Sequence, residues 1–146
     1  RGGEMAEFIA TICAGLWSGG CIYLSLVQHP AAHRAGPDIA AALFRPMSAR
    51  AAPMFIVLAL VGTVAGVYAW FQGAGISWLI GAMFLGAMFP FTAILIVPTN
   101  RRLLKIKPGE VGGSDELFAR WGRLHGLRAL LGSIAFLVFV AALTFN

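Results

Sequence analysis

The sequence predicts an all-α membrane protein, a bundle of four transmembrane helices with a short helix in the first cytoplasmic loop. Hydrophobic residues make up 59% of the 146 residues and charged residues only 12%, whereas a soluble domain is about half apolar and one-quarter charged. The mean hydropathy is +0.81. The apolar residues also fall into four runs, each close to the roughly 20 residues that a helix needs to cross the hydrocarbon of a bilayer.

These runs predict a single transmembrane domain over residues 1–146, with spans near 8–27, 53–71, 76–97 and 124–145. The first span is expected to end at His29, because Pro30 disfavours helical geometry in the residue before it. The short loop helix covers residues 39–44, with Asp38 placed to cap its start.

The short turn at residues 72–75 carries no charge and joins the second and third spans, which must therefore be antiparallel neighbours. Pro90 lies inside the third span. An internal proline removes one backbone hydrogen bond and usually kinks a helix. Two glycine pairs spaced four residues apart, Gly15 with Gly19 and Gly62 with Gly66, are expected to face neighbouring helices, since small residues let helix backbones approach closely.

Basic residues predict the orientation of the bundle. The loop after the first span contains Arg34, Arg45 and Arg50, and the loop after the third contains Arg101, Arg102, Lys105, Lys107, Arg120 and Arg123. The opposite side has only Arg1, offset by two glutamates. The positive-inside rule places both long loops in the cytoplasm and both termini outside, in what we expect to be a bacterial inner membrane. The pI near 10.0 thus indicates contact with lipid headgroups, not nucleic acid.

The stretch that begins the fourth span carries the strongest functional signal. Trp121, His125 and Arg128 are spaced i, i+4 and i+7, so they share one helix face. Ionisable groups at membrane depth are costly and by default face the protein interior. The alternative is an arginine that snorkels to the interface beside a tryptophan anchor. Because the spans alternate in direction, His29 after the first span and Asn100 after the third lie at the same end of the bundle as the start of the fourth. We therefore expect all five residues to line one cavity at the cytoplasmic end of the bundle.

Four short motifs in this order resemble the DUF1772, anthrone-oxygenase-like family. They are His29-Pro30-Ala31 after the first span, Pro90-Phe91-Thr92 inside the third, Pro98, Asn100 and Leu103 after it, and Trp121, His125 and Arg128 before the fourth. The resemblance covers nearly the whole chain. It implies a membrane oxygenase that uses O2 on an electron-rich aromatic or quinone-type molecule. The resemblance assigns no cofactor and is compatible with a reaction that needs none.

The resemblance also suggests roles for particular residues. His125 or His29 would be the base that removes a proton from an acidic C–H, since imidazole titrates near neutral pH. Arg128 would stabilise the oxyanion that forms, and Asn100 would donate a hydrogen bond to it. The substrate-binding candidates are Trp121, which would stack on the ring system, together with Phe89, Phe91 and Arg45.

Two other functional classes stay open. His29 and His125 lie at one membrane face and are candidates to ligate a haem or a copper ion, because imidazole suits both. No C-x-x-C or H-E-x-x-H spacing indicates a metal site. Alternatively, the chain is a non-catalytic subunit that packs through its glycine pairs as a homo-oligomer or within a larger membrane complex. The expected partners are otherwise the lipid bilayer and a hydrophobic aromatic small molecule.

Overall fold

The computed structural model describes residues 2–107, 109 and 112–145, and these form four long helical segments. The first comprises α1 (Gly2–Tyr23), the π-helical η1 (Leu24–Gln28) and α2 (His29–Arg34); the second is α3 (Pro37–Phe71). The third comprises α4 (Ile76–Gly86), α5 (Met88–Phe91), the π-helical η2 (Thr92–Ile96) and α6 (Val97–Leu103); the fourth is α7 (Asp115–Phe145). Each segment is long and apolar enough to cross a membrane, which supports an integral membrane protein and confirms the all-α, four-span class.

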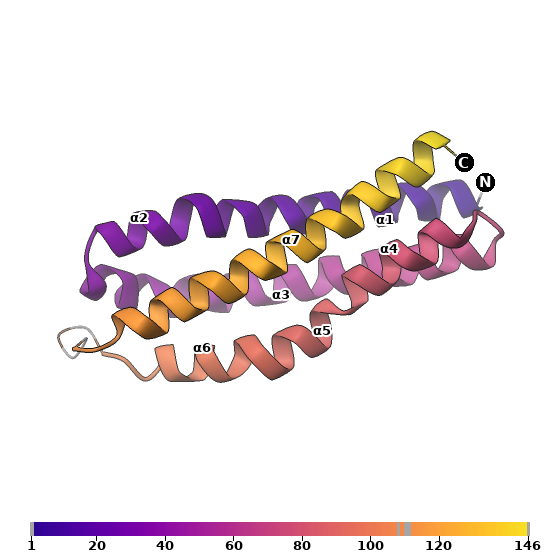
Figure 1. Cartoon of the computed structure of the whole chain (residues 1–146). Helices are drawn as coiled ribbons and strands as arrows, with labels where there is room; N and C mark the ends of the chain where they lie inside the picture. Colours follow the sequence, from indigo (N-terminus) through magenta and orange to yellow (C-terminus); the bar gives the residue numbers. More distant parts are fainter. Residues whose placement is uncertain (1, 108, 110–111, 146) are drawn as a thin grey trace.

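The four segments run antiparallel in one bundle (Figure 1). The two chain termini lie together at one end, which we call the terminal end. At the other end lie α2, α6 and the start of α7, and most of the arginines and lysines occur in or next to these elements. We call this the basic end.

The first segment does not end at His29, as the sequence analysis expected, but continues as helix to Arg34. The backbone N–H of His29 donates to the carbonyl of Leu24, five residues back, which is π-helical pairing. The proline ring at position 30 would clash with a carbonyl in a regular α-helical turn, and the wider π turn makes room for it. The same arrangement recurs where Val97 N–H donates to the Thr92 carbonyl just before Pro98.

The expected short helix of the first loop is present but is not separate from the second span. α3 is one helix of 35 residues that contains both Pro46 and Pro53. Its N-terminal cap is Gly36, with φ 113°, and not Asp38. Asp38 instead accepts a hydrogen bond of 2.6 Å from the backbone N–H of Gly109.

The third segment bends near Pro90, as expected. α4 ends at Gly86, and Ala87 separates it from α5. Pro90 has no N–H to donate to the carbonyl of Gly86, four residues earlier, and its ring pushes that carbonyl aside. α4 packs against α3 and α7, whereas beyond the break α5 and α6 run away from α3 toward the basic end (Figure 1). The bend therefore separates the second and third segments in one half of the bundle.

Three of the four expected glycine contacts are confirmed, at Gly15, Gly62 and Gly66. A Cβ added at these positions would lie between 2.7 and 3.0 Å from side chains of other helices. The expectation is wrong for Gly19, which is exposed and has nothing within 4 Å of an added Cβ. A Cβ added at the next residue, Gly20, would instead lie 3.0 Å from the ring of Phe55.

The core consists of two clusters. The larger one joins α1, α3, α4 and α7 along most of the bundle and includes Trp17, Trp78 and Phe139. The smaller one lies at the basic end, and we call it the basic-end cluster; it comprises Ala40, Ala41, Phe44, Leu103, Phe118 and Trp121. Residues from both clusters line the cavity described next.

Candidate functional site

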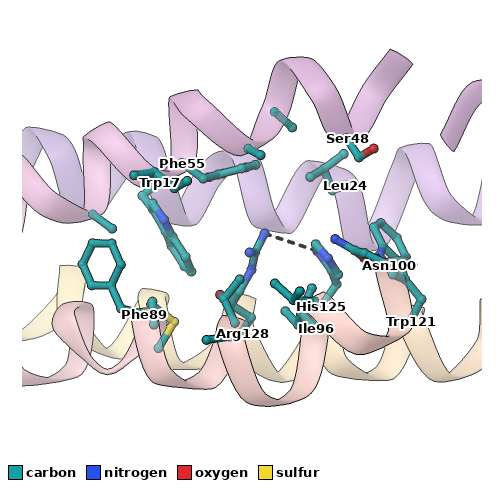
Figure 2. A pocket seen from close by; sticks show the side chains of 18 of the residues that line it. Trp17, Leu24, Ser48, Phe55, Phe89, Ile96, Asn100, Trp121, His125 and Arg128 are labelled. Atoms are coloured by element: carbon teal, nitrogen blue, oxygen red, sulfur yellow. Dashed lines mark hydrogen bonds between the residues drawn. The ribbon is translucent and has the colours of Figure 1, made fainter. Parts of the chain in front are cut away.

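A cavity of about 320 Å³ lies inside the bundle and takes walls from all four helical segments. Its apolar lining includes Trp17, Leu24, Met47, Phe55, Ile56, Met88, Phe89 and Ile96. Its polar lining comprises Ser48, Thr92, Asn100, Trp121, His125 and Arg128. Figure 2 shows Arg128, His125, Asn100 and Trp121 following one another along one side of this space.

α7 places three of these polar side chains in a row. Trp121, His125 and Arg128 are 3%, 5% and 6% exposed, and all three line the cavity. Their spacing puts Arg128 about 10 Å beyond Trp121 along the helix axis, at about 1.5 Å per residue. The prediction that this face turns into the bundle, and that Arg128 does not snorkel to the interface, matches their burial.

The guanidinium of Arg128 is buried among aromatic rings. Its central carbon lies 5.3 Å from the ring centroid of Trp17 and 5.1 Å from that of Phe55. Its Nη2 lies 3.4 Å from Nδ1 of His125, and the thiol of Cys21 also interacts with it. Its Nε is buried without a hydrogen-bond partner. No Asp or Glu lines the cavity, so the described residues offer this cation ring faces and neutral groups but no anion.

The hydrogen bond to Arg128 indicates the tautomer of His125. A guanidinium only donates, so the Nδ1 that faces it acts as acceptor. In the neutral ring the proton is therefore on Nε2, and the lone pair of Nδ1 points at the guanidinium. The imidazole also stacks on the indole of Trp121, with centroids 3.8 Å apart. These two contacts fix both the plane and the direction of the ring.

Asn100, near the end of α6, is oriented by Trp121. The indole Nε1 donates to Oδ1 of Asn100 over 2.8 Å. Because an indole N–H cannot accept, the oxygen of the amide must face the ring and its NH2 group must point elsewhere. No acceptor for this NH2 group is found among the described residues, and Asn100 lines the cavity. The amide is thus free to donate to a bound molecule.

His29 does not line this cavity, contrary to the expectation from the alternating direction of the spans. Its ring lies 5.0 Å from Trp121 and lines a separate pocket of about 20 Å³ together with His33 and Phe44. The helix continues through His29, so its side chain follows the helix surface and does not fold over the bundle mouth. Gly122 makes room for it, since a Cβ there would lie 2.6 Å from Nε2 of His29.

Of the other three substrate-binding candidates, one lines the cavity and two do not. Phe89 lines the cavity and is 36% exposed. Phe91 is absent from the lining, because residues two apart on a helix point in directions about 200° apart. Arg45 is exposed and also outside the cavity; its Nη2 donates to the backbone carbonyl of Leu104 over 3.0 Å.

The two rings that flank Arg128 were not predicted from the sequence. Trp17 lies in the middle of the first span, away from the membrane interfaces where tryptophan is enriched. This unusual position is the feature of the sequence that could have marked Trp17 as a candidate. Gly132 was also missed: a Cβ added there would clash with the ring of Trp17. A glycine on α7 is thus what allows the Trp17 indole to lie beside the helix that carries Arg128.

The described residues contain no group of three or more His, Cys, Asp or Glu side chains that could hold a metal ion. The two imidazoles considered for haem or copper line different pockets. Both rings contact the indole of Trp121 instead, at 5.0 Å for His29 and 3.8 Å for His125.

Comparison with known proteins returns one family. The family model described as anthrone oxygenase matches residues 40–138, more than half of the chain. The matched range begins within α3 and extends into α7, so it includes Asn100, Trp121, His125 and Arg128. No curated protein and no solved structure matches the chain.

Proposed function

We propose that this chain, which belongs to the anthrone oxygenase family, is a membrane oxygenase that binds a hydrophobic aromatic or quinone-type molecule in its cavity and promotes oxidation of that molecule by O2. The observation that carries the proposal is the buried guanidinium of Arg128, which lines an otherwise mainly apolar cavity and keeps an unpartnered Nε. At about 320 Å³, the cavity falls within the range of about 300–1,000 Å³ typical of small-molecule sites.

A buried cation without an anionic partner is costly to a fold. Contact with the Trp17 and Phe55 rings offsets part of this cost. An anionic oxygen on a bound molecule would offset more, because a charge-assisted hydrogen bond is about twice as strong as a neutral one. The cavity therefore favours an aromatic ligand that carries, or develops, negative charge on oxygen.

The base and the oxyanion donor of the proposed reaction are neighbours. Nδ1 of His125, the unprotonated nitrogen, lies 3.4 Å from Nη2 of Arg128 and accepts a hydrogen bond from it. If Arg128 turned to bind an oxygen of the ligand, the lone pair of Nδ1 would be released. An activated methylene between two aromatic rings would transfer a proton to Nδ1, and the electron pair would delocalise onto a ring carbonyl oxygen held by Arg128. The amide of Asn100 would donate a further hydrogen bond to a polar group of the ligand.

The oxidation itself balances with O2 as the oxidant. The deprotonated carbon would give its electrons to O2 and form a C–O bond to it. One oxygen atom would remain as the new carbonyl and the other would leave as water, so that one methylene and one O2 yield one ketone and one H2O. In this scheme the residues of the chain bind the molecule, move one proton and stabilise one negative charge.

The orientation and organisation of the chain also belong to this proposal. The basic residues of the two long loops favour a cytoplasmic basic end with both termini outside, so the Asn100 end of the cavity would lie toward the cytoplasm of a bacterial inner membrane. The four helical segments would form a single domain.

The test uses the purified protein in lipid nanodiscs with 1,8-dihydroxyanthrone. Oxygen uptake and quinone absorbance are followed together, and the spontaneous rate is subtracted. We expect one O2 consumed per quinone and a loss of about 100-fold in rate for Arg128→Met, the size associated with one oxyanion donor. Arg123→Met, an exposed position on the same helix, is the matched control. Full turnover in Arg128→Met, or no turnover in the parent on any anthrone tried, contradicts the proposal.

A further inference from the structure

The cavity has one side that faces outward between two helical segments. One wall of this side is α3, through Ala52 and Ile56, and the other is the bent part of the third segment, through Phe89 and Ala93. All four residues line the cavity and are also exposed, Ile56 to 54% and Phe89 to 36%. We call the opening between these two walls the slit.

The slit is closed at both ends. Toward the terminal end, α3 and α4 are in tight contact, since a Cβ at Gly62 would lie 2.7 Å from Leu85, and one at Gly86 would lie 3.2 Å from Thr63. Toward the basic end, the hydrogen bond of 3.0 Å from Arg45 to the Leu104 carbonyl joins the start of α3 to the residue after α6. Arg45 thus ties the two walls of the slit together.

The end of the cavity that faces the basic loops is packed with side chains. Trp121, Phe44 and Leu103 of the basic-end cluster are 3%, 4% and 2% exposed. The rings of Phe44 and Trp121 meet edge to face with centroids 5.6 Å apart. A molecule approaching from the aqueous side would have to separate this cluster, whereas a molecule at the slit meets only the exposed side chains of its rim.

The rim of the slit suits the hydrocarbon of a bilayer. Ile56 and Phe89 lie within long apolar helical segments, and the four rim residues are all apolar. A hydrophobic aromatic molecule concentrates in the bilayer and not in water. The polar groups of the cavity, His125 and Arg128, lie behind this rim on α7 and are buried.

We propose that the slit is the route by which a lipophilic aromatic molecule passes between the bilayer and the cavity, with Ala52, Ile56, Phe89 and Ala93 as its gate. The proposal rests on the proposed function for the identity of the ligand but not for the existence of the route. It explains why the cavity of a membrane protein is open to the side and closed toward the basic loops.

The route can be tested with a small lipophilic photolabel that needs no catalysis. Trifluoromethyl-phenyl-diazirine is added to the protein in phosphatidylcholine nanodiscs, and samples are flashed at increasing delays. Labelled residues are then identified by mass spectrometry. We expect rapid labelling of Trp17 and Met88, which line the cavity but are only 1% and 2% exposed. The double variant Ala52→Phe/Ala93→Phe should slow that labelling about tenfold by narrowing the gate.

The matched control is Val57→Phe/Ile94→Phe. These positions are 57% and 69% exposed beside the rim and do not line the cavity, so labelling of Trp17 and Met88 should keep the parent rate. Leu137, 62% exposed on α7, reports label in the bilayer and should react equally in all variants.

Three results would overturn the route. They are absence of label on Trp17 and Met88 in the parent, equal rates in the gate variant and the control, and protection of Ile56 itself, which would mean that a second copy of the chain covers the slit. Failure of the proposed function gives a different pattern, in which the photolabel enters through the slit as expected but no anthrone is oxidised.

Discussion

The indole N–H of Trp121 donates to Oδ1 of Asn100 over 2.8 Å, and this bond joins the first turns of α7 to α6. The same indole stacks on His125 at 3.8 Å and meets the Phe44 ring of α3 at 5.6 Å. It also contacts His29 at the start of α2, with ring centroids 5.0 Å apart. One side chain therefore touches all four helical segments and orients two of the polar groups in the cavity.

This bond predicts energetic coupling between the two residues. Trp121→Phe keeps an aromatic ring but removes the donor, and Asn100→Ala removes the acceptor. In a double-mutant cycle on thermal or denaturant unfolding in detergent, we expect a coupling of about 1 kcal/mol, the usual net value of one hydrogen bond. Additive effects would show that the bond contributes nothing to the free energy of unfolding.

Arg128 predicts a conflict between stability and function. Replacing a buried ion pair with apolar residues of similar volume is often neutral or stabilising, by about 1–4 kcal/mol. A buried cation without an anionic partner carries the same kind of desolvation cost and has no ion-pair energy to lose. We therefore expect Arg128→Met to keep or raise the unfolding temperature while it weakens binding of 1,8-dihydroxyanthraquinone, followed by tryptophan quenching. A large loss of stability would instead make Arg128 a structural residue, held mainly by its contacts with Trp17 and Phe55.

Much of this arrangement follows from sequence patterns. Apolar run lengths predict the four long helices, and the i, i+4, i+7 spacing places Trp121, His125 and Arg128 on one buried face. Pro90 marks the bend in the third segment. Each of these features depends on local periodicity or on the chemistry of a single residue, which a sequence displays directly.

Other features depend on contacts between distant segments. The helix was expected to end at His29 because the residue before a proline disfavours αR geometry, yet His29 keeps φ −63° and ψ −49°. The π turn at η1 relieves a different clash, the one between the proline ring and a carbonyl of the preceding turn. Gly19 and Gly20 are equivalent in a pattern of small residues, and only the position of Phe55 on α3 selects Gly20. Arg45 carries no sequence signal for its bond to the Leu104 carbonyl, because a backbone acceptor can belong to any residue.

The glycines of α7 give a prediction with an internal control. A Cβ at Gly132 would overlap the ring of Trp17, whereas one at Gly126 meets nothing within 4 Å. We expect Gly132→Ala to destabilise the bundle by about 1–3 kcal/mol, as overpacking does. Gly126→Ala should be neutral or stabilising by up to about 1 kcal/mol, because alanine is the better helix former. Unfolding temperatures in detergent measure both, and equal shifts would contradict the close packing of Trp17 against α7.

The proposed orientation of the bundle predicts opposite labelling of its two ends. In a background with Cys13 and Cys21 replaced by alanine, Gly113→Cys lies in the loop before α7 and Gly73→Cys lies in the turn between α3 and α4. A membrane-impermeant thiol reagent applied to intact bacterial cells should label Gly73→Cys only, and inverted vesicles should reverse the result. Labelling of Gly113→Cys in intact cells would reverse the proposed topology.

Pro90 bends the third segment away from α3 and so opens the slit, and replacing Pro90 tests this effect. Pro90→Ala restores a backbone N–H and removes the ring that interrupts the third segment after Gly86. We expect α4 to extend through Ala87, α5 to swing toward α3, and the slit to narrow. Photolabelling of Trp17 should then slow, although the unfolding temperature stays equal or rises, because a proline inside a helix costs about 3 kcal/mol.

Pro53→Ala is the matched control, since Pro53 lies inside α3 without interrupting it. If Trp17 is labelled as fast in Pro90→Ala as in the parent, packing of the bent segment against α7 holds the slit open, and the proline only accommodates that bend.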